Sequence, residues 1–324
     1  MLANLIVAQL VNGITLGGMY ALIALGYTLV YGILLMINFA HSELFMCGAF
    51  VGLGVMTLLT SPAIIEKFPA LGFLAPAQQF FTSSKLGMVC MLLIVFLVAA
   101  IVVGIMGVVI ERLAYRPLRH APRLAPLISA VGVSIFLQNA VLLWVSSSQV
   151  PFPNPFGTAM AFQLGGTPVS VLKVVIVVTA ITLMVALDQF ISRTRMGKAM
   201  RATSQDREAA GLMGIDINLS IMLAFFIGPA LGAVAGVFSG MYYGSVVFYM
   251  GFLPGMKAFT AAVIGGIGNL RGAMLGGFVL GIVESLASGF ISTGYKDVIA
   301  FAILILVLIF RPGGLLGESV VEKV

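Results

Sequence analysis

Residues 87–110 read GMVCMLLIVFLVAAIVVGIMGVVI, an uncharged apolar run. As a helix rising about 1.5 Å per residue, this run is long enough to cross the roughly 30 Å hydrocarbon core of a bilayer. Similar runs recur along the chain, but the run at 258–270 is too short to cross. We therefore predict eight membrane-spanning helices and one or two segments that enter the membrane without crossing it. The runs lie at 5–35, 43–60, 87–110, 125–146, 170–190, 217–243, 258–270, 272–292 and 297–310.

The composition agrees with an all-α, polytopic membrane protein. Of 324 residues, 60% are hydrophobic and only 9% are charged, and the mean hydropathy is +1.15. Average soluble domains are about 45–50% apolar and about 25% charged, so this chain has too few charges to cover a soluble surface. A membrane β-barrel would show alternating segments of about ten residues, which are absent. We treat residues 1–324 as a single transmembrane domain. Its net charge of +6 lies in short loops and does not indicate nucleic-acid binding.

Two basic loops predict the orientation in the membrane. Loops rich in Lys and Arg stay in the cytoplasm, and two predicted spans separate these loops, which places both on the same side. Segments 61–86 and 147–169 are then external, as is the N-terminus. The tail beyond Arg311, which ends in the charged segment Glu318–Lys323, is expected to be cytoplasmic. The first loop contains Arg112, Arg116, Arg119 and Arg123, and the second contains Arg193, Arg195, Lys198, Arg201 and Arg207.

The two halves of the chain share a faint pattern that predicts inverted repeats. In each half a glycine-rich stretch leads into a polar interruption and then into a second glycine-rich stretch. The interruptions are Asn38–Glu43 and Gly265–Arg271, and the two units face opposite ways across the membrane. Paired interrupted segments mark the transport path in many transporters, although glycines also cluster by chance. The long first run is expected to break at one of Gly13, Gly17, Gly18, Gly26 and Gly32.

The interruptions supply candidates for a translocation path, because polar groups inside apolar runs cost free energy. If the segments are helix breaks, their freed amides and carbonyls can meet a zwitterionic solute. If they are cytoplasmic hairpins, the first is only a solvated turn with a helix cap at Ser42. We expect the interruptions to approach one another, with apolar walls from Phe39, Ile264 and Ile267. The path candidates are Asn38, Phe39, Glu43, Gly266 and Asn269.

A glycine ladder predicts close helix packing in the second half of the chain. Glycines four residues apart align on one helix face and let backbones approach closely in lipid. A permeation surface lined by backbone is the alternative. Glu284, in an apolar run, is expected to face the protein interior, either in a structural hydrogen bond or on the path. The ladder consists of Gly228, Gly232, Gly236, Gly240 and Gly244.

No catalytic or metal-binding motif stands out. His41 and His120 lack metal-ligand spacing, and Gly197-Lys198 is followed by Ala199 instead of the Ser or Thr of a P-loop. We therefore expect no enzymatic activity, no metal and no cofactor in this chain.

Residues 193–216 form the most informative polar segment. Strong helix formers lie between two glycines, Gly197 and Gly214, which predicts one short amphipathic cytoplasmic helix. Orientation needs only a few positive residues, so a helix that docks a cytoplasmic partner is favoured over a solvated loop that only sets the topology. The side chains available for contact are Ala199, Ala202, Ala209, Ala210 and Leu212.

Taken together, the motifs resemble the family of branched-chain amino acid ABC permeases, and within it the LivH-type subunits. Glu208-Ala209-Ala210-x-x-x-Gly214 matches the EAA motif with which ABC importer permeases dock an ATPase subunit. One departure is Ser42, where many relatives carry Gly. The resemblance covers nearly the whole chain. The other matching motifs are Tyr20–Tyr27, Met36–Glu43, Glu111–Pro117, Ser134–Asn139, Lys257–Gly268, Tyr295–Val298 and Arg311–Gly317.

The resemblance implies one half of a heterodimeric permease, surrounded by the lipid of a bacterial inner membrane. A LivM-like permease would be its partner, two cytoplasmic ATPase subunits would bind ATP, and a periplasmic binding protein would deliver leucine, isoleucine or valine. Glu208, Ala209, Ala210 and Gly214 would dock an ATPase. A urea or short-amide permease of the same family is the nearest alternative. An ion-coupled secondary transporter would need more intramembrane charge, and a purely structural membrane subunit is the third possibility.

Overall fold

The computed structural model describes residues 2–119, 121–122, 124–311 and 313–317. His120, Arg123 and the segment Glu318–Lys323 lie outside the described residues. Within the described residues, eight helices are long and apolar enough to cross a membrane, as predicted. They are α1 (Leu2–Leu34), α2 (His41–Thr60), α5 (Lys85–Ile110) with its extensions η2 (Glu111–Tyr115) and η3 (Arg116–Leu118), α6 (Leu124–Trp144), α7 (Val171–Arg193), α10 (Ile217–Tyr243), α12 (Leu270–Phe290), and α13 (Lys296–Phe310) with the preceding turn η4 (Thr293–Tyr295).

Shorter elements connect these spans. The apolar helix α11 (Phe252–Gly265) has only 14 residues, too few to cross a bilayer, and so agrees with a segment that enters without crossing. The others are α3 (Pro62–Lys67), η1 (Pro69–Leu74), α4 (Ala75–Ser83), β1 (Val150–Pro151), β2 (Met160–Leu164), β3 (Thr167–Ser170), α8 (Arg195–Gln205), α9 (Arg207–Leu212) and β4 (Ser245–Val246). β2 pairs with β3, and β1 pairs with β4, both antiparallel.

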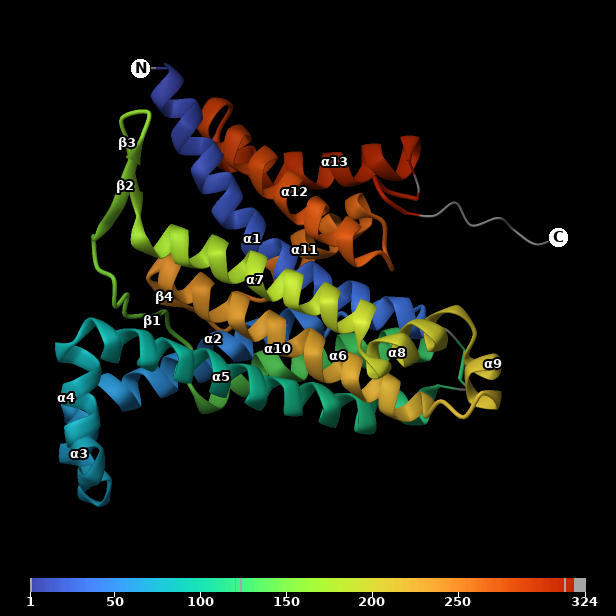
Figure 1. Ribbon diagram of the computed structural model, residues 1–324, viewed down its shortest axis with the longest axis horizontal. Coiled ribbons are helices and arrows are strands. Elements are labelled where there is room, and N and C mark those ends of the chain that lie inside the picture. The colour runs from blue at the N-terminus through green and yellow to red at the C-terminus, as the bar shows by residue number, and fades with distance from the viewer. Residues whose placement is uncertain (1, 120, 123, 312, 318–324) are drawn as a thin grey trace.

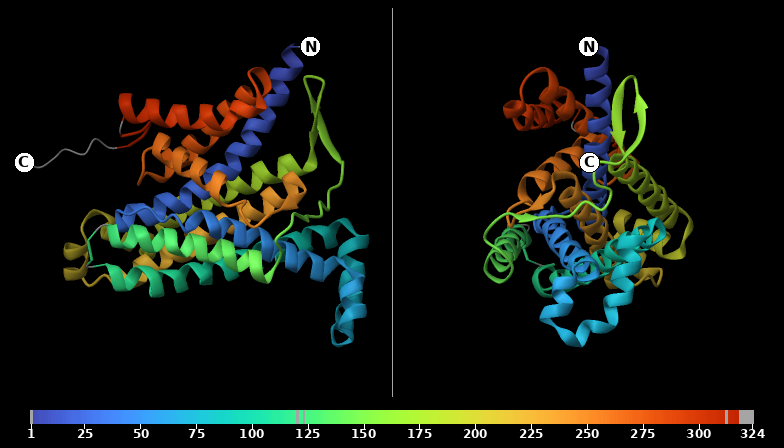
Figure 2. Two further views of the ribbon diagram at one scale, coloured as in Figure 1. Left: turned by 180° about the vertical axis from the view of Figure 1, so that it is seen from behind. Right: turned by 90° about the vertical axis from the view of Figure 1, so that its left-hand side faces the viewer.

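The bundle has a basic end, which carries α8, α9 and the end of η3 (Figure 1). Arg119 of the first basic loop contacts the chain just after the second one there, since its Nη1 donates to Asn218 Oδ1 (2.6 Å) at the start of α10. The N-terminus and the β2–β3 hairpin lie at the opposite end, where Thr167 donates to the Asn4 carbonyl (3.1 Å). Figures 1 and 2 show α3 and α4 projecting sideways at that end too. The positive-inside rule assigns the basic end to the cytoplasm.

Helices α1, α2 and α10 form the centre of the bundle. α10 packs against α1, α2 and α5, while α1 packs along α12. By contrast, α13 lies at the periphery (Figure 1), and most of its apolar side chains are exposed. Because lipid is as apolar as these side chains, the centre must be held by close packing and hydrogen bonds between helices.

Four glycines of the ladder place α10 directly against its neighbours. A Cβ atom at Gly236 would lie 2.9 Å from the backbone nitrogen of Ala49 on α2, closer than van der Waals contact allows. Glycine at this position therefore sets the distance between the two helix backbones. Around the other three, Gly228 faces Gly26 of α1, Gly232 faces the ring of His41, and Gly240 faces the ring of Phe152.

Two glycine expectations do not hold. Gly244 is not a packing residue: it ends α10 in the left-handed conformation (φ 71°), and a Cβ there would touch nothing within 4 Å. Its role is that of a helix cap, for which glycine is the usual residue. The break expected in the first run is also wrong, because α1 is continuous. Its glycines serve packing instead, as at Gly17, where a Cβ would lie 2.7 Å from Cα of Phe278 on α12.

The assignment of the two ends predicts a labelling pattern. In a background with Cys47 and Cys90 replaced by Ala, a cysteine at Ser147 should react with an impermeant maleimide added outside intact cells. A cysteine at Gln205 should react only after permeabilisation. Both positions are exposed, whereas the neighbouring Thr203 is buried and would make a poor probe. Reaction of both cysteines from the same side would refute the span count.

Candidate translocation path and coupling segment

The interruption Asn38–Glu43 is a buried helix break. α1 ends at Leu34, Leu35 has a positive φ of 54°, and α2 begins at His41. His41 Nε2 donates to the carbonyl oxygen of Ile23 (3.2 Å), 11 residues before the end of α1. At about 1.5 Å per residue, the chain has returned about 16 Å into the bundle before α2 starts.

The solvated-turn alternative for this segment is wrong. Asn38, His41, Ser42 and Glu43 are all buried. Ser42 does not cap α2, because its hydroxyl donates to the Phe39 carbonyl (2.7 Å) and the N-cap position is held by Ala40 without a side-chain bond. Irregular backbone at membrane depth is tolerated where protein or a water-filled cavity surrounds it, and here protein surrounds it.

Glu43 is the most polar group at this break. Its Oε1 accepts hydrogen bonds from Ser134 and Gln138 of α6, both at 3.2 Å. Its Oε2 is buried and has no hydrogen-bond partner among the described residues. An unsatisfied buried carboxylate oxygen costs free energy, so this atom is placed to accept a proton or a hydrogen bond from a solute or water. The contacts with α6 were not predicted from the sequence, although the motif Ser134–Asn139 contains both donors.

Asn38 and Phe39 complete the first interruption. Asn38 Oδ1 accepts from the hydroxyl of Tyr115 (2.6 Å) in η2, while its Nδ2 has no partner among the described residues. Phe39 is half-buried and packs on the apolar core. Asn38 therefore ties the break to the first basic loop.

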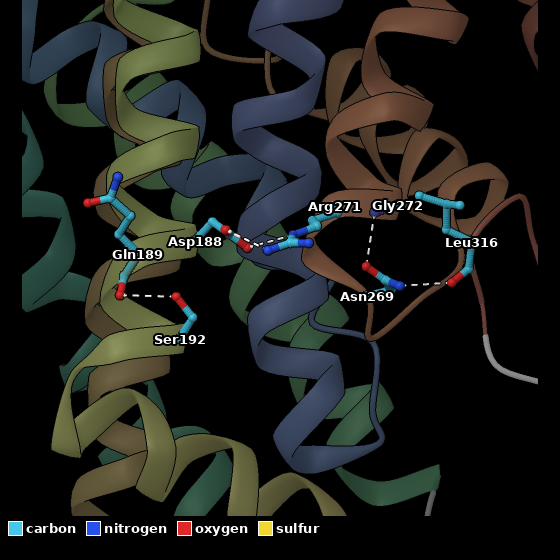
Figure 3. A network of polar contacts seen from close by, with 7 residues as sticks. All are labelled: Asp188, Gln189, Ser192, Asn269, Arg271, Gly272 and Leu316. Atoms are coloured by element: carbon cyan, nitrogen blue, oxygen red, sulfur yellow. Dashed lines mark hydrogen bonds and ion pairs between the residues drawn. The ribbon is translucent and has the colours of Figure 1, made fainter.

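The second interruption is closed by the segment around Leu316. α11 ends at Gly265, and Gly266 and Gly268 turn the backbone with φ values of 105° and 96°. Asn269 caps α12 by accepting from the backbone nitrogen of Gly272 (3.1 Å), and its Nδ2 donates to the Leu316 carbonyl (2.8 Å; Figure 3). Asn269 thus makes a structural contact with the described tail.

The two interruptions come close through apolar side chains. Ile37, just before the first, and Ile267, within the second, line one small cavity together with Phe259 of α11. Their polar groups have separate partners, since Asn38 bonds to Tyr115 and Asn269 to Leu316. In this structure the two interruptions therefore approach one another through apolar side chains and not through their polar groups. Their shared role in transport stays a prediction.

The tail contact leads to a stability prediction. Leu315 and Leu316 donate backbone hydrogen bonds to the carbonyls of Ile264 (2.8 Å) and Gly265 (3.0 Å), which end α11 and are buried. Ending the chain after Arg311 should lower the free energy of unfolding by about 2–6 kcal/mol, since each of the two unsatisfied buried carbonyls costs about 1–3 kcal/mol. Thermal unfolding in detergent measures this change. Ending the chain after Gly317 keeps these bonds and serves as the control; equal loss in both would argue against the capping role.

A buried ion cluster links α11, α12 and α13. Lys257 Nζ lies 2.6 Å from Glu284 Oε1 and 2.6 Å from Asp297 Oδ1. The Tyr20 ring lies beneath the same ammonium group, 5.9 Å from its centroid. Glu284 faces the protein interior, as expected, but the triad was missed. The sequence does contain an indication of the triad, because a Lys inside an apolar helix needs an acidic partner within the membrane.

The predicted coupling helix is two helices. Asp206 interrupts it and caps α9 by accepting from the backbone nitrogen of Ala209 (3.0 Å). The expected single helix is therefore wrong, because the side chain of Asp206 offers the backbone a new helix start. Gly214 follows with a φ of 79°, which favours glycine.

α9 lies at the tip of the basic end (Figure 1), and large apolar side chains are exposed there. Leu212 and Met213 are 89% and 82% exposed, while Ala210 is buried against the protein. Glu208 and Ala209 are exposed beside them. Large apolar side chains on such a small projecting helix are typical of contact points for another protein.

Arg207 ties α9 to the end of α1. Its guanidinium donates from Nε (3.1 Å) and Nη2 (2.5 Å) to the carbonyl oxygen of Ile33, one residue before α1 ends. Burial, together with the nearby positive charge of Arg119, lowers the pKa of Arg207, but a guanidinium stays charged in proteins. Arg119 itself pairs with Glu111. A displacement of α9 would therefore act on the residues just before the Asn38–Glu43 break.

The comparisons with known proteins agree with these features. Residues 9–308 match the family described as branched-chain amino acid transport system / permease component. The chain is 46% identical over 319 residues to the high-affinity branched-chain amino acid transport system permease protein BraD of Pseudomonas aeruginosa, covering 98% of this chain and 97% of BraD.

Two other relatives cover most of the chain. It is 46% identical to the high-affinity permease protein LivH of Escherichia coli, over 98% of this chain and 97% of LivH. It is 26% identical to a probable branched-chain amino acid transport permease protein LivH of Methanocaldococcus jannaschii, over 94% and 91%. No solved structure gives a significant match. With eight helices in the described part of the chain that can span a membrane, the chain belongs to the branched-chain amino acid ABC transport permeases, as a LivH-like, multi-pass protein of the inner membrane.

Proposed function

We propose that this chain forms half of the path by which an ATP-driven importer carries leucine, isoleucine and valine across the inner membrane. A LivM-like permease supplies the other half, and a periplasmic binding protein delivers the amino acid. Two cytoplasmic ATPase subunits bind the ATP, so the chain itself carries out no chemistry. The observation that carries this proposal is the tip of α9, where Leu212 and Met213 are exposed within an EAA-type motif.

The coupling step follows from the contacts of the basic end. An ATPase subunit docks on α9 through Glu208, Ala209 and Leu212, and Gly214 allows the backbone to turn behind the docked helix. Movement of α9 passes through Arg207 to the carbonyl of Ile33 and so to the end of α1. The nearest interruption of the helices beyond it is the break at Asn38–Glu43, whose opening and closing we assign to alternating access.

The path itself runs past Glu43, with Phe39 as an apolar wall. The free Oε2 of Glu43 accepts a hydrogen bond from the ammonium group of the amino acid when the break opens, and Ser134 and Gln138 hold the other oxygen in place. Gly266 and Asn269 shape the second interruption beside Ile267.

Reconstitution tests the proposal. The chain is purified with its co-expressed LivM-like and ATPase subunits, placed in liposomes, and supplied with binding protein and ATP. We expect ATP-dependent uptake of labelled leucine that unlabelled isoleucine and valine inhibit and that urea and acetamide do not. Uptake of urea or acetamide in place of leucine would show the short-amide permease instead. Uptake without ATP would contradict the ABC mechanism.

A single substitution tests the path. Glu43→Ala should lower leucine uptake at least about tenfold, because a hydrogen bond to a charged group contributes about 1.5–3 kcal/mol, while the ATPase subunits stay bound. Glu66→Ala is the matched control, since Glu66 is an exposed carboxylate at the opposite end. Normal uptake by Glu43→Ala would remove Glu43 from the path.

A further inference from the structure

A cleft of about 820 Å³ opens at the basic end of the molecule. The end of α7 and the helix α8 form one wall, the turn before α12 forms the other, and the end of α1 forms the floor. Figure 3 shows Asp188 on the α7 side and Arg271 on the α12 side pointing toward one another, while Ser192 and Asn269 are turned toward partners on their own sides. Asp188 lies near the end of the membrane-spanning helix α7, and Arg271 lies at the start of α12. Both helix ends border the cleft together with α8, so the cleft lies at the level of the lipid head groups.

The charges that line the cleft leave one guanidinium uncompensated. Asp188 is the only acidic residue among the described lining residues, and both of its oxygens accept from Arg271, each at 3.1 Å. Arg201 makes one hydrogen bond in the described part of the chain, from Nη2 to the Ser192 carbonyl (3.3 Å). A guanidinium has five N–H donors, so Arg201 has donors left for an anion in the cleft.

The inner end of the cleft is apolar. A narrower recess continues from it between α1 and α8, past Leu29, Ile33 and Met200, as far as Thr28. The Thr28 hydroxyl is buried and has no hydrogen-bond partner among the described residues. The cleft is therefore amphipathic, with a cationic rim and an apolar interior.

Apolar strips lead from the charged pair along the surfaces of both helices. On α7, Ile181 and Val185 are exposed and lie seven and three residues before Asp188, on the same helix face. On α12, Leu275 and Val279 are exposed and lie four and eight residues after Arg271, again on one face. These strips run from the head-group level toward the middle of the membrane.

We propose that this cleft binds the phosphate head group of an anionic phospholipid from the leaflet at the basic end. Arg201 pairs with the phosphate, since a guanidinium matches phosphate oxygens with two parallel hydrogen bonds. The acyl chains lie along the apolar strips of α7 and α12. Basic pockets between helices on the cytoplasmic side are suited to anionic head groups.

The bound lipid would brace α8, which leads directly into the coupling helix α9. The proposal depends on the membrane position of the basic end but not on how ATPase subunits dock. Its test can therefore fail while the proposed function holds.

Native mass spectrometry of the purified complex tests the site, with phosphatidylglycerol and phosphatidylcholine of equal chain length as probes. The wild type should retain phosphatidylglycerol at least tenfold more strongly than phosphatidylcholine. Arg201→Gln should lose this preference, and Arg201→Lys, which keeps the charge but not the planar donor pair, should keep part of it. Arg195→Gln is the matched control, because Arg195 is exposed on the same helix but does not line the cleft.

The possible contrary results are distinct. Equal retention of the two lipids by the wild type, or an unchanged preference in Arg201→Gln, would overturn the proposal, and the wild-type comparison stands even if that variant does not fold. Displacement of the lipid by inorganic phosphate would identify a soluble anion as the ligand. Loss of an ATPase subunit from Arg201→Gln, with lipid retention intact, would identify a protein as the occupant.

Discussion

Replacing Leu212 and Met213 together by Asp is expected to release the ATPase subunits from the purified complex and to lower leucine uptake at least about 30-fold. Both side chains are almost fully exposed at the tip of α9, so the substitution removes no internal packing. Buried apolar anchors at an interface contribute about 2 kcal/mol or more each, and about 1.4 kcal/mol corresponds to a tenfold change. Carboxylates at this position would also have to be desolvated on docking.

Co-purification of the tagged chain with its ATPase subunits measures this effect directly. The matched control is the pair Met160→Asp and Leu164→Asp, at exposed positions of similar chemistry in the β2–β3 hairpin at the opposite end. The thermal stability of the chain should be unchanged in both double variants. If the Leu212 and Met213 variant still carries its ATPase subunits and transports normally, α9 is not the docking element.

Replacing Lys257 by Met is expected to destabilise the chain by about 3–5 kcal/mol, the usual cost of leaving one member of a buried ion pair without its partner. The carboxylate of Glu284 is buried, and Lys257 provides its only described cation. Asp297 is partly exposed, so leaving its carboxylate without Lys257 would cost less free energy. The loss should appear as a lower unfolding temperature in detergent and a lower yield of folded protein in the membrane.

A second substitution separates this electrostatic effect from lost packing. Adding Glu284→Gln to Lys257→Met should recover a large part of the stability, because the uncompensated buried charge is then gone. Lys173→Met is the matched control, since Lys173 donates to the neutral amide of Asn12 (2.7 Å) and has no described carboxylate partner. If the double variant is no more stable than Lys257→Met, the triad does not hold α11 in place by charge pairing.

The inverted repeats predicted from glycine and polar patterning stay a prediction, with support from helix packing. α1 packs along α12, and α10 packs along α2. If the two halves are repeats, α1 corresponds to α10 and α2 corresponds to α12. The packing of α1 on α12 then corresponds to the packing of α10 on α2. The sequence pattern located both interruptions, but it did not indicate that the tail near Leu316 closes the second one.

The sequence by itself determined the spans, the shared end of the two basic loops, and the family. These features depend on local properties: the length of an apolar run, the charge of a loop, and motifs such as Glu208–Gly214. The same local properties decide whether a segment can span a bilayer, because each helix must form all of its backbone hydrogen bonds within itself when it lies in lipid. The exposed position of Leu212 could also be anticipated, since it lies within the EAA-type motif.

Only the tertiary structure decided which side chains meet inside the bundle. Glu43 finds Ser134 and Gln138 at sequence separations of 91 and 95 residues, and Lys257 finds Glu284 and Asp297 on two other helices. In a soluble helix an apolar stripe marks the face that packs on the core. In this chain nearly every side of a span is apolar, because both the lipid and the protein interior favour apolar side chains. The pattern of residues along a span therefore does not reveal its neighbours, and the partners of Glu43 and Lys257 emerge only when the helices pack.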